Sequence, residues 1–216
     1  MTPARNRVTP HGDLVAVPLR GAFTGNRGIL HDGREIVRFH AHDSWVTCSL
    51  EYKGLRREQW VPHRMTWLFF HDEAVSFAAG HRPCALCRRS DYDRYRAAWA
   101  DALGGPAPSA KEINRVLHGE RIVRGTHRRR LHEARARDLP DGVFVELDGA
   151  PHVLTGDAAV AWTVEGYGDP RARPRSGPLT VITPPSTVAA LRAGYASQID
   201  PGSARWNGRV ADDSAP

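Results

Sequence analysis

The ten residues GHRPCALCRR, at positions 80–89, decide how this chain is expected to fold. They contain two of its three cysteines, Cys84 and Cys87, in a C-x-x-C spacing. Such a turn brings two thiolates to one side of a tight bend, where a single tetrahedral ion contacts both. Zinc is the usual metal for this spacing in a chain that is not rich in disulfides. The stretch therefore predicts a zinc site, the alternative being two thiols packed beneath the turn.

A zinc site needs ligands beyond this pair. The third cysteine, Cys48, ends the run WVTC and is the expected third ligand, the alternative being a core cysteine. His81 is the preferred fourth ligand, because the H-x-x-C-x-x-C spacing places it on the same turn; the alternatives are His71, His63 and His42. Four protein ligands would make the zinc structural, whereas three would leave a position for a nucleophilic water.

The residues around the turn carry a resemblance to a known family. Phe69-Phe70 is followed by Asp72-Glu73-Ala74, by the run AAGHRPCALCR at positions 78–88 and by Asp91. This segment resembles the second half of the metal-binding domain of Ada-type DNA alkylation-repair proteins. There, a Phe-Phe or Phe-Tyr run and a short Ala-rich helix precede Ala-Gly-Phe-Arg-Pro-Cys-x-x-Cys. The resemblance covers residues 66–91 and implies a zinc fold with DNA as the partner.

The chain also departs from that family. In the family, an upstream C-x-x-x-C pair completes the zinc site, and one of its thiolates accepts a methyl group from a DNA phosphotriester. Here the segment from Tyr52 to Thr66 contains no cysteine, Cys48 is single and lies earlier, and His81 replaces an aromatic residue. The resemblance therefore implies the zinc fold and leaves methyl transfer without its cysteine pair.

Composition sets the outer limits. The 216 residues suit one domain or two small ones, and an apolar fraction of 41% is ordinary for a protein with a buried core. The first ten residues lack an apolar leader and no run approaches 18 apolar residues, so we expect neither a signal peptide nor a membrane span. Three cysteines, an odd number, favour reduced thiols in the cytoplasm over a disulfide framework.

The charge of the chain indicates an anionic partner. Its formal net charge is +6, and only Lys53 and Lys111 are lysines, a bias that a GC-rich genome would also produce. The positions of the basic residues are more informative than their number. Arginines and histidines are concentrated in residues 121–137, and the only acidic residues from Arg121 to Asp138 are Glu133 and Asp138 itself. We expect DNA-phosphate contacts here, the alternative being a solvated linker. The expected contact residues are Arg121, Arg124, Arg128, Arg129 and Arg130.

Two further functions stay open. His118 and Glu120 lie two residues apart at an expected helix end, and they are the candidates for a catalytic pair in a metal-dependent nuclease or hydrolase. Their spacing matches neither the zincin form nor a His-Asn-His nuclease pattern. The other alternative is a structural zinc module used for protein contacts. Whether the protein is an enzyme is therefore undecided by sequence.

The pattern of the chain predicts an α+β fold. We expect a zinc-containing N-terminal module of short strands and helices over residues 1–105, a helix plus a β-rich module over 106–201, and a disordered tail over 202–216. The segment 58–61 is expected to be a strand and 168–178 a mobile loop rich in Pro, Arg and Gly.

Local signals place several elements. A short helix is expected over Asp72–Ala79, ended by Gly80. A longer one begins at Ser90 as N-cap, and Ser109 with Glu112 forms a capping box. The dipeptide at 148–149 is Asp-Gly, which favours a type I′ hairpin, and the prolines at 184–185 begin a last helix.

Overall fold

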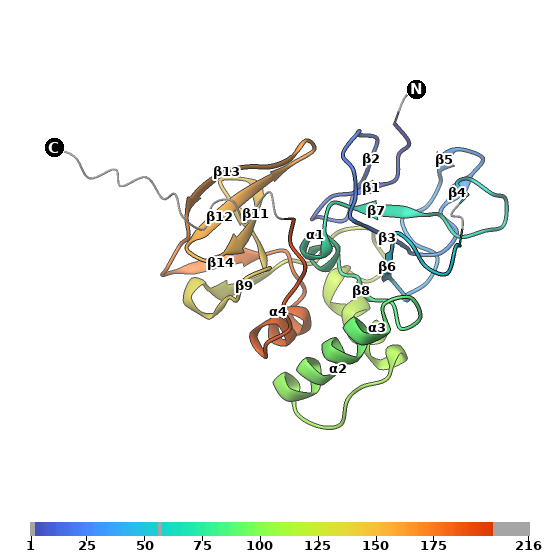
Figure 1. Ribbon diagram of the computed structural model, residues 1–216. Coiled ribbons are helices and arrows are strands. Elements are labelled where there is room, and N and C mark those ends of the chain that lie inside the picture. Colours follow the sequence, from blue (N-terminus) through green and yellow to red (C-terminus); the bar gives the residue numbers. More distant parts are fainter. Residues whose placement is uncertain (1–2, 56–57, 201–216) are drawn as a thin grey trace.

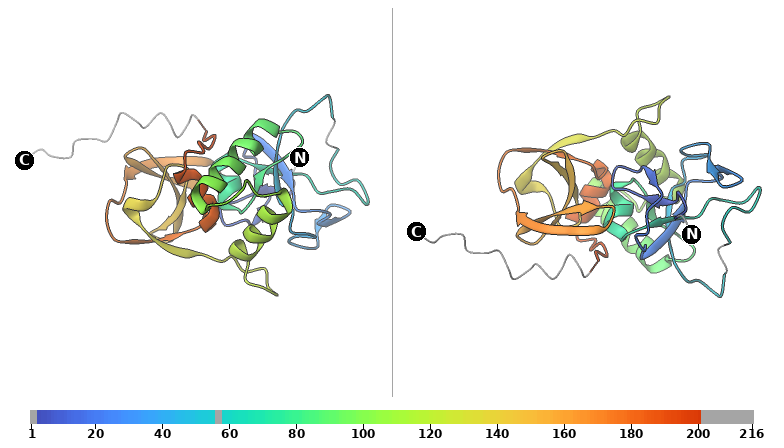
Figure 2. Two further views of the ribbon diagram at one scale, coloured as in Figure 1. Left: turned by 90° about the horizontal axis from the view of Figure 1, so that it is seen from below. Right: turned by 90° about the horizontal axis from the view of Figure 1, so that it is seen from above.

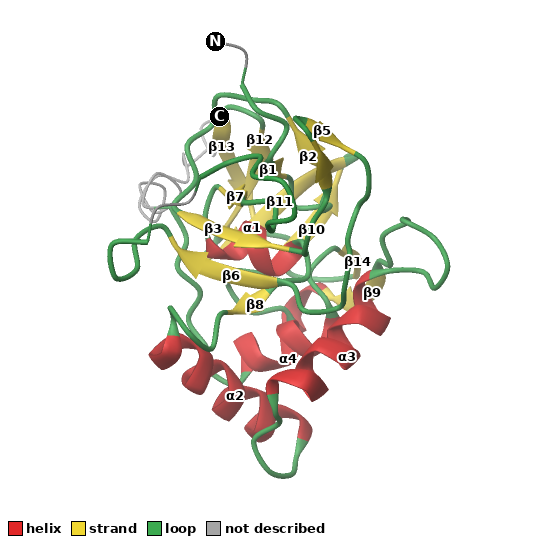
Figure 3. Cartoon of the chain, turned by 90° about the vertical axis from the view of Figure 1, so that its right-hand side faces the viewer, coloured by secondary structure: helices red, strands yellow, loops and turns green. Residues whose placement is uncertain are grey.

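The computed structural model describes residues 3–55 and 58–200, so the tail expected at 202–216 lies outside the described residues. It is a mixed α+β fold with two sheets on either side of a short helix, α1 (Glu73–Ala78) (Figure 1). Three longer helices gather along one side of the two sheets, α2 (Arg89–Leu103), α3 (Ala110–Arg121) and α4 (Pro185–Arg192) (Figure 3). None of the described helices is long and apolar enough to cross a membrane.

The N-terminal sheet is mixed and made of very short strands. Its order is β2-β1-β7-β3-β6-β8, with β1 parallel to β7 and β6 parallel to β8. The strands are β1 (Arg7–Val8), β2 (Leu14–Val15), β3 (Phe23–Asn26), β6 (Val46–Ser49), β7 (Leu68–Phe70) and β8 (Arg82–Pro83). A separate two-stranded ribbon is formed by β4 (His31–Asp32) and β5 (Glu35–Ile36). Strands this short form few ladder hydrogen bonds, so the sheet depends on other interactions.

The C-terminal sheet is antiparallel throughout and has longer strands. Its order is β13-β12-β11-β10-β14-β9. The strands are β9 (His132–Arg135), β10 (Phe144–Leu147), β11 (Ala150–Thr155), β12 (Ala158–Thr163), β13 (Gly166–Ala172) and β14 (Pro178–Val181). Between β10 and β11, Asp148 and Gly149 both have positive φ, 52° and 77°, as a type I′ turn requires.

The helices pack against the C-terminal sheet in two apolar clusters, and apolar side chains of the N-terminal sheet form a third, smaller one. Every residue of α1 is buried, and its Ala74, Val75 and Ala78 pack against the C-terminal sheet. A larger cluster combines side chains of α2, α3 and α4 with strands of the same sheet, among them Tyr95, Leu117, Val145, Leu154 and Leu191. The core therefore extends across residue 105, where the sequence suggests a module boundary.

Several local predictions are confirmed. Asp72 caps α1 by accepting a hydrogen bond from the Val75 amide, and Gly80 follows with φ 81°. Gly80 is also required sterically, since a Cβ there would lie 2.6 Å from Cδ of Arg121. Ser109 and Glu112 form the expected capping box. Pro185 stands in the first turn of α4.

Three expectations are wrong. The segment 58–61 is no strand; its Trp60 has φ 62°, a left-handed conformation that interrupts an extended chain. Much of 168–178 is strand β13, an edge strand whose Pro170 is tolerated because an edge leaves one side unpaired. Ser90 is not the N-cap of the second helix, because α2 already begins at Arg89 and its N-cap is Arg88, which makes no side-chain capping hydrogen bond.

Candidate metal centre

Three cysteines meet at one edge of the N-terminal sheet. The sulfurs of Cys48, Cys84 and Cys87 all lie within 4.8 Å of one another. Cys48 is buried, and Cys84 and Cys87 are half-buried. Three convergent thiols could hold a metal ion such as zinc, the metal that favours tetrahedral thiolate sites.

A parallel pairing of strands brings these cysteines together. Strand β6 pairs with β8 so that Thr47 lies opposite Pro83, and the Cys84 amide donates to the Thr47 carbonyl at 2.9 Å. Cys48 therefore lies beside the C-x-x-C turn that follows β8. The turn closes with a hydrogen bond from the Arg88 amide to the Cys84 carbonyl, 3.1 Å, and leads directly into α2.

The surroundings of the sulfurs favour negative charge on Cys84, whose pKa is lowered, whereas the pKa values of Cys48 and Cys87 are raised. The Leu86 amide lies 3.5 Å from Sγ of Cys84, and amides of Cys87 and Ser49 also donate to sulfurs of the group. Hydrogen bonds from the Cys48 and Cys87 side chains lower the pKa of Cys84, and the bond between Cys48 and Cys84 raises the pKa of Cys48. A thiolate among three close sulfurs is the state that attracts a metal cation.

His81, the expected fourth ligand, is not part of the group. No histidine, aspartate or glutamate in the described ranges, 3–55 and 58–200, joins the three sulfurs within the same 4.8 Å. Instead, the His81 ring is fully buried against Phe70 and Trp45, with centroids 4.6 Å and 5.2 Å away. Successive side chains of an extended segment face opposite ways, so a residue three before Cys84 points away from it.

The electrostatics of His81 agree with a core role. Its Nε2 lies 3.3 Å from Nε of Arg27, and because arginine only donates, this imidazole nitrogen accepts. Burial lowers the pKa of His81 well below its usual value, and the charges of Arg27 and Arg121 lower it further. The side chain is therefore a neutral member of the core.

The alternative histidines are also placed elsewhere. His71 Nε2 bonds to the Asp200 carboxylate at 2.7 Å, and its ring packs on Tyr167. His42 and His63 are exposed, and neither joins the sulfur group. The protein ligands that the described residues supply are thus three, which leaves a fourth tetrahedral position for a water or another small ligand.

Two of the arginines expected on a DNA-binding surface, the buried Arg121 and the half-buried Arg129, direct their guanidiniums to backbone carbonyls of the protein itself. The guanidinium of Arg121 is buried over Trp45, 3.9 Å from the ring centroid, and donates to the Gly80 carbonyl at 2.7 Å. Arg129 donates to carbonyls of Arg121 at 3.2 Å and Ile182 at 3.3 Å. Both expectations are wrong, because these side chains satisfy backbone carbonyls that the irregular segments leave free.

The other three expected arginines are exposed. Arg124, Arg128 and Arg130 belong to the turn after α3 and the segment leading to β9. This turn projects from the body of the molecule in both views of Figure 2. Among the residues the structure describes, no carboxylate forms an ion pair with any of the three. Their charge is available to an external partner.

His118 and Glu120 do not work as a pair. The Glu120 carboxylate accepts from the Ser186 hydroxyl at 2.6 Å and from its amide at 3.1 Å, which fastens it to the first turn of α4. His118 Nδ1 instead lies 3.1 Å from Nη2 of Arg121. Residues two apart on a helix face different sides, so the expected catalytic pair is not assembled.

One cluster around Trp45 has no counterpart in any sequence motif. Arg27 and Arg121 both lie over the ring of Trp45, at 4.1 Å and 3.9 Å, and His40 packs against His118 with centroids 5.1 Å apart. Arg27 comes from the end of β3 and His40 from the loop before β6. No spacing in the chain links them, since only the folded sheet brings these segments to the end of α3.

Comparisons with protein-family models, curated proteins and solved structures find no match to this chain. The three-cysteine geometry and the arginine placement therefore carry the functional argument.

Proposed function

We propose that this chain is a zinc-binding protein whose partner is DNA. Its zinc, bound by three cysteines and open to a small ligand at the fourth position, fastens the N-terminal sheet to the turn that begins α2. The observation that carries the proposal is the meeting of three thiol sulfurs within 4.8 Å. Cys48 comes from β6, while Cys84 and Cys87 come from the turn that begins α2. One ion bound to all three ties together segments that are 36 or more residues apart in the chain.

Charge supports DNA as the partner. The net charge is +6, and the projecting turn after α3 carries unpaired arginines at positions 124, 128 and 130. A guanidinium group can donate two parallel hydrogen bonds to the oxygens of one phosphate, and its charge releases counterions from DNA. The resemblance of residues 66–91 to the Ada-type metal-binding domain supports a role in nucleic-acid maintenance, including alkylation repair. Methyl transfer is outside the proposal, because the family's upstream C-x-x-x-C pair is missing and Cys48 is the single cysteine before the C-x-x-C turn.

The salt dependence of DNA binding tests the partner. We expect the triple variant with Arg124, Arg128 and Arg130 changed to Ala to bind DNA more weakly whatever its sequence. The log–log salt slope should flatten by about 0.9 for each phosphate that the variant no longer neutralises. Fluorescence anisotropy at several salt concentrations measures both quantities. Zinc content should not change, since arginine has no acceptor atom to offer a metal ion.

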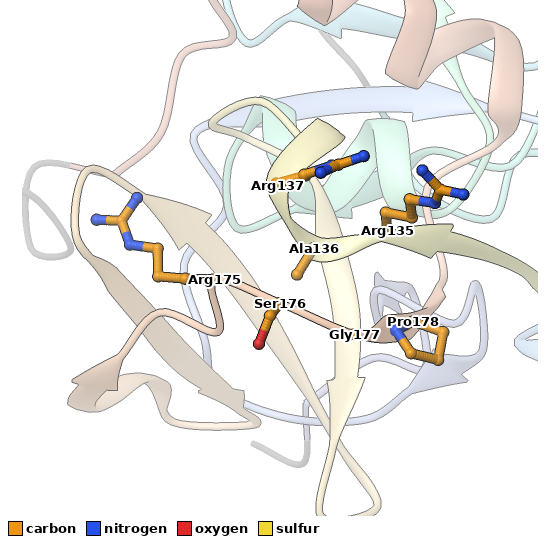
Figure 4. Close-up of a pocket in the computed structure, with 7 residues that line it drawn as sticks. All are labelled: Arg135, Ala136, Arg137, Arg175, Ser176, Gly177 and Pro178. Carbon is orange, nitrogen blue, oxygen red and sulfur yellow. The ribbon is translucent and has the colours of Figure 1, made fainter.

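A second triple variant removes the same charge elsewhere. Arg135, Arg137 and Arg175 surround a cavity of about 440 Å³ on the C-terminal sheet, lined also by Ser176 and Pro178 (Figure 4). Because Arg135 and Arg137 belong to the basic stretch 121–137, the control instead changes the exposed Arg94, Arg171 and Arg175 to Ala. It lowers the net charge equally and should leave the slope nearly as in the parent. Equal effects of the two triple variants, or a parent without DNA binding near physiological salt, would contradict the proposal. The remaining interpretation is then a zinc module for protein contacts.

A further inference from the structure

A cavity of about 630 Å³ lies at the C-terminal end of α3. Its wall carries three imidazoles and three guanidiniums, and no carboxylate is among the residues that line it. We refer to it as the cationic pocket, and its charged or titratable lining residues are His40, His118, His127, Arg115, Arg124 and Arg130. A concave surface of one charge sign concentrates counter-ions of the other.

More positive charge lies behind this wall. Trp45 packs against His40 and His118, with centroids 5.7 Å and 6.4 Å away, and the guanidiniums of Arg27 and Arg121 lie over its ring. Neither arginine is ion-paired within the described part of the chain, and Nη2 of Arg27 has no hydrogen-bond partner there. Buried charge is costly, and the carboxylates of Asp13 and Asp43 attract these guanidiniums without pairing with them. An anion bound in the pocket offsets the charge further.

A second, smaller hollow adjoins the cationic pocket. It measures about 320 Å³ and has an apolar wall formed by Leu14, Ile36, Val37 and Phe39. His127 lines both cavities, and its ring lies 5.9 Å from that of Phe39 and 6.4 Å from that of His40. A single side chain therefore separates the two, which we call the cationic pocket and the Phe39 hollow.

We propose that these adjoining cavities bind one nucleotide unit of single-stranded nucleic acid, with its phosphate in the cationic pocket and its base against Phe39. The inference rests on the proposed function and specifies the strandedness of the partner. Arginine supplies donors matched to phosphate oxygens, and an aromatic ring beside an apolar wall accepts the flat face of any base.

The chemistry of the imidazoles suits the same ligand. Arginine cannot accept a hydrogen bond, so Nδ1 of His118 accepts from Arg121 and its Nε2 carries the proton. Burial and neighbouring charges lower the pKa values of both His40 and His118, which keeps these rings neutral near pH 7. His118 therefore offers its Nε2–H as a donor to a phosphate oxygen, and the neutral His40 offers one donor and one acceptor, which suits a sugar hydroxyl.

The arrangement favours single strands over duplexes. In a duplex, both faces of each base are covered by neighbouring bases, so no base can enter a hollow beside its own phosphate. An unpaired base turns outward without breaking base pairs. The Phe39 hollow, at about 320 Å³, has room for one such base against its apolar wall.

Fluorescence anisotropy with a labelled single-stranded oligonucleotide and its duplex tests the inference. We expect the parent to prefer the single strand, and Phe39→Leu to weaken single-strand binding about five- to a hundredfold, the range for losing one base–aromatic stack. Duplex affinity should change less than twofold. Tyr52→Leu is the matched control, because it removes a partly buried ring that lines neither cavity.

A second variant, at Val37, tests the same hollow without altering Phe39, in case Phe39→Leu disturbs the fold. Val37 is 53% exposed in the hollow, and Val37→Asp places a carboxylate where the base would lie. Val164, 40% exposed on the C-terminal sheet, gives the control Val164→Asp with the same added charge. Only the change at position 37 should weaken single-strand binding by more than fivefold.

The outcomes separate this inference from the proposed function. If the parent binds duplex as tightly as single strand, or if both Phe39→Leu and Val37→Asp bind the single strand as the parent does, the nucleotide site is refuted while DNA binding stands. If the parent binds neither form, the proposed partner and the nucleotide site fail together. A single-strand preference that both variants abolish supports the site.

Discussion

The two sheets of this molecule are held together in different ways. Strands of the N-terminal sheet are two to four residues long, whereas those of the C-terminal sheet have four to seven. Around the first, polar side chains are buried and bonded, as where Thr24 Oγ1 donates to the Leu68 carbonyl at 2.8 Å. The second packs apolar side chains such as Val145 and Leu154 against three helices.

The difference shows what each sheet needs. An antiparallel sheet whose longest strands reach six or seven residues forms long hydrogen-bond ladders and buries one apolar face against helices. Two-residue strands do not, and cross-links from outside the ladder must replace what is missing. In the N-terminal half these are the cysteine group and the buried guanidiniums that bond to loop carbonyls. A metal site is a common substitute for a small apolar core.

The largest expected effect comes from removing a metal ligand. Cys84→Ser should release the zinc and unfold the N-terminal sheet, since a structural zinc contributes about 10–16 kcal/mol in zinc-finger peptides. Native mass spectrometry measures the metal, and hydrogen exchange shows which sheet loses protection. The C-terminal sheet should keep more of its protection.

Leu86→Ser is the matched control for that variant. Leu86 stands between the two cysteines, but its side chain is 69% exposed and supplies no ligand. It should keep one zinc per molecule and the melting temperature of the parent. Parent-like stability in a zinc-free Cys84→Ser protein would show that the short strands need no metal.

The second effect is smaller and belongs to the other sheet. Leu154 is fully buried on β11, and Leu154→Ala should lower the free energy of unfolding by about 2–5 kcal/mol, because it exchanges buried methyl groups for a residual cavity. Urea unfolding measures this change. Zinc content should stay at the parent value, because the cavity forms in the sheet that does not carry the cysteines.

A surface valine gives the reference for that measurement. Val164 is 40% exposed at the end of β12, and Val164→Ala should change the free energy of unfolding by no more than about 0.5 kcal/mol. If Leu154→Ala also releases zinc, the two sheets unfold as one unit, and the proposed difference in what stabilises each sheet is contradicted.

Sequence alone predicts the parts that depend on local chemistry. The C-x-x-C turn, the Asp72 cap with Gly80, the capping box of α3 and the Asp148-Gly149 hairpin each follow from residues within a few positions of one another. Each signal depends on which nearby backbone groups a side chain can hydrogen-bond, or on which backbone dihedrals a residue can adopt. Distant segments do not change these local preferences.

The parts that sequence does not predict depend on distant segments. The expectation that Cys48 joins Cys84 and Cys87 is confirmed, but the parallel pairing of β6 with β8 that brings it there is encoded by nothing near Cys48. Arg121 is expected at the surface because arginine usually lies there, but Gly80 leaves room for it beneath Trp45. Spacing assigns His81 to the metal, whereas the extended backbone before the turn directs its ring into the core.

The smallest expected effect is a pH dependence centred on His40. Burial, the neighbouring His118 and the charge of Arg121 lower the pKa of His40 to about 4, against about 6.5 in an unfolded chain. Between those values the unfolded chain binds a proton that the folded protein does not, so the free energy of unfolding falls as the pH falls from 6.5 towards 4. The lowered pKa of His118 acts in the same direction. His40→Gln should therefore lose stability less steeply over this range, by at most ~1.4 kcal/mol per pH unit and by less where solvent screens the half-exposed ring. Urea unfolding at pH 7, 6 and 5 measures the slope, with zinc content checked at each pH because protonated thiols release metal.

Titration of the His40 ring by NMR measures the pKa directly. A value at or above 6.5 would mean that the charged groups around Trp45 do not act on His40. That result would weaken the contrast between a polar N-terminal half and an apolar C-terminal one.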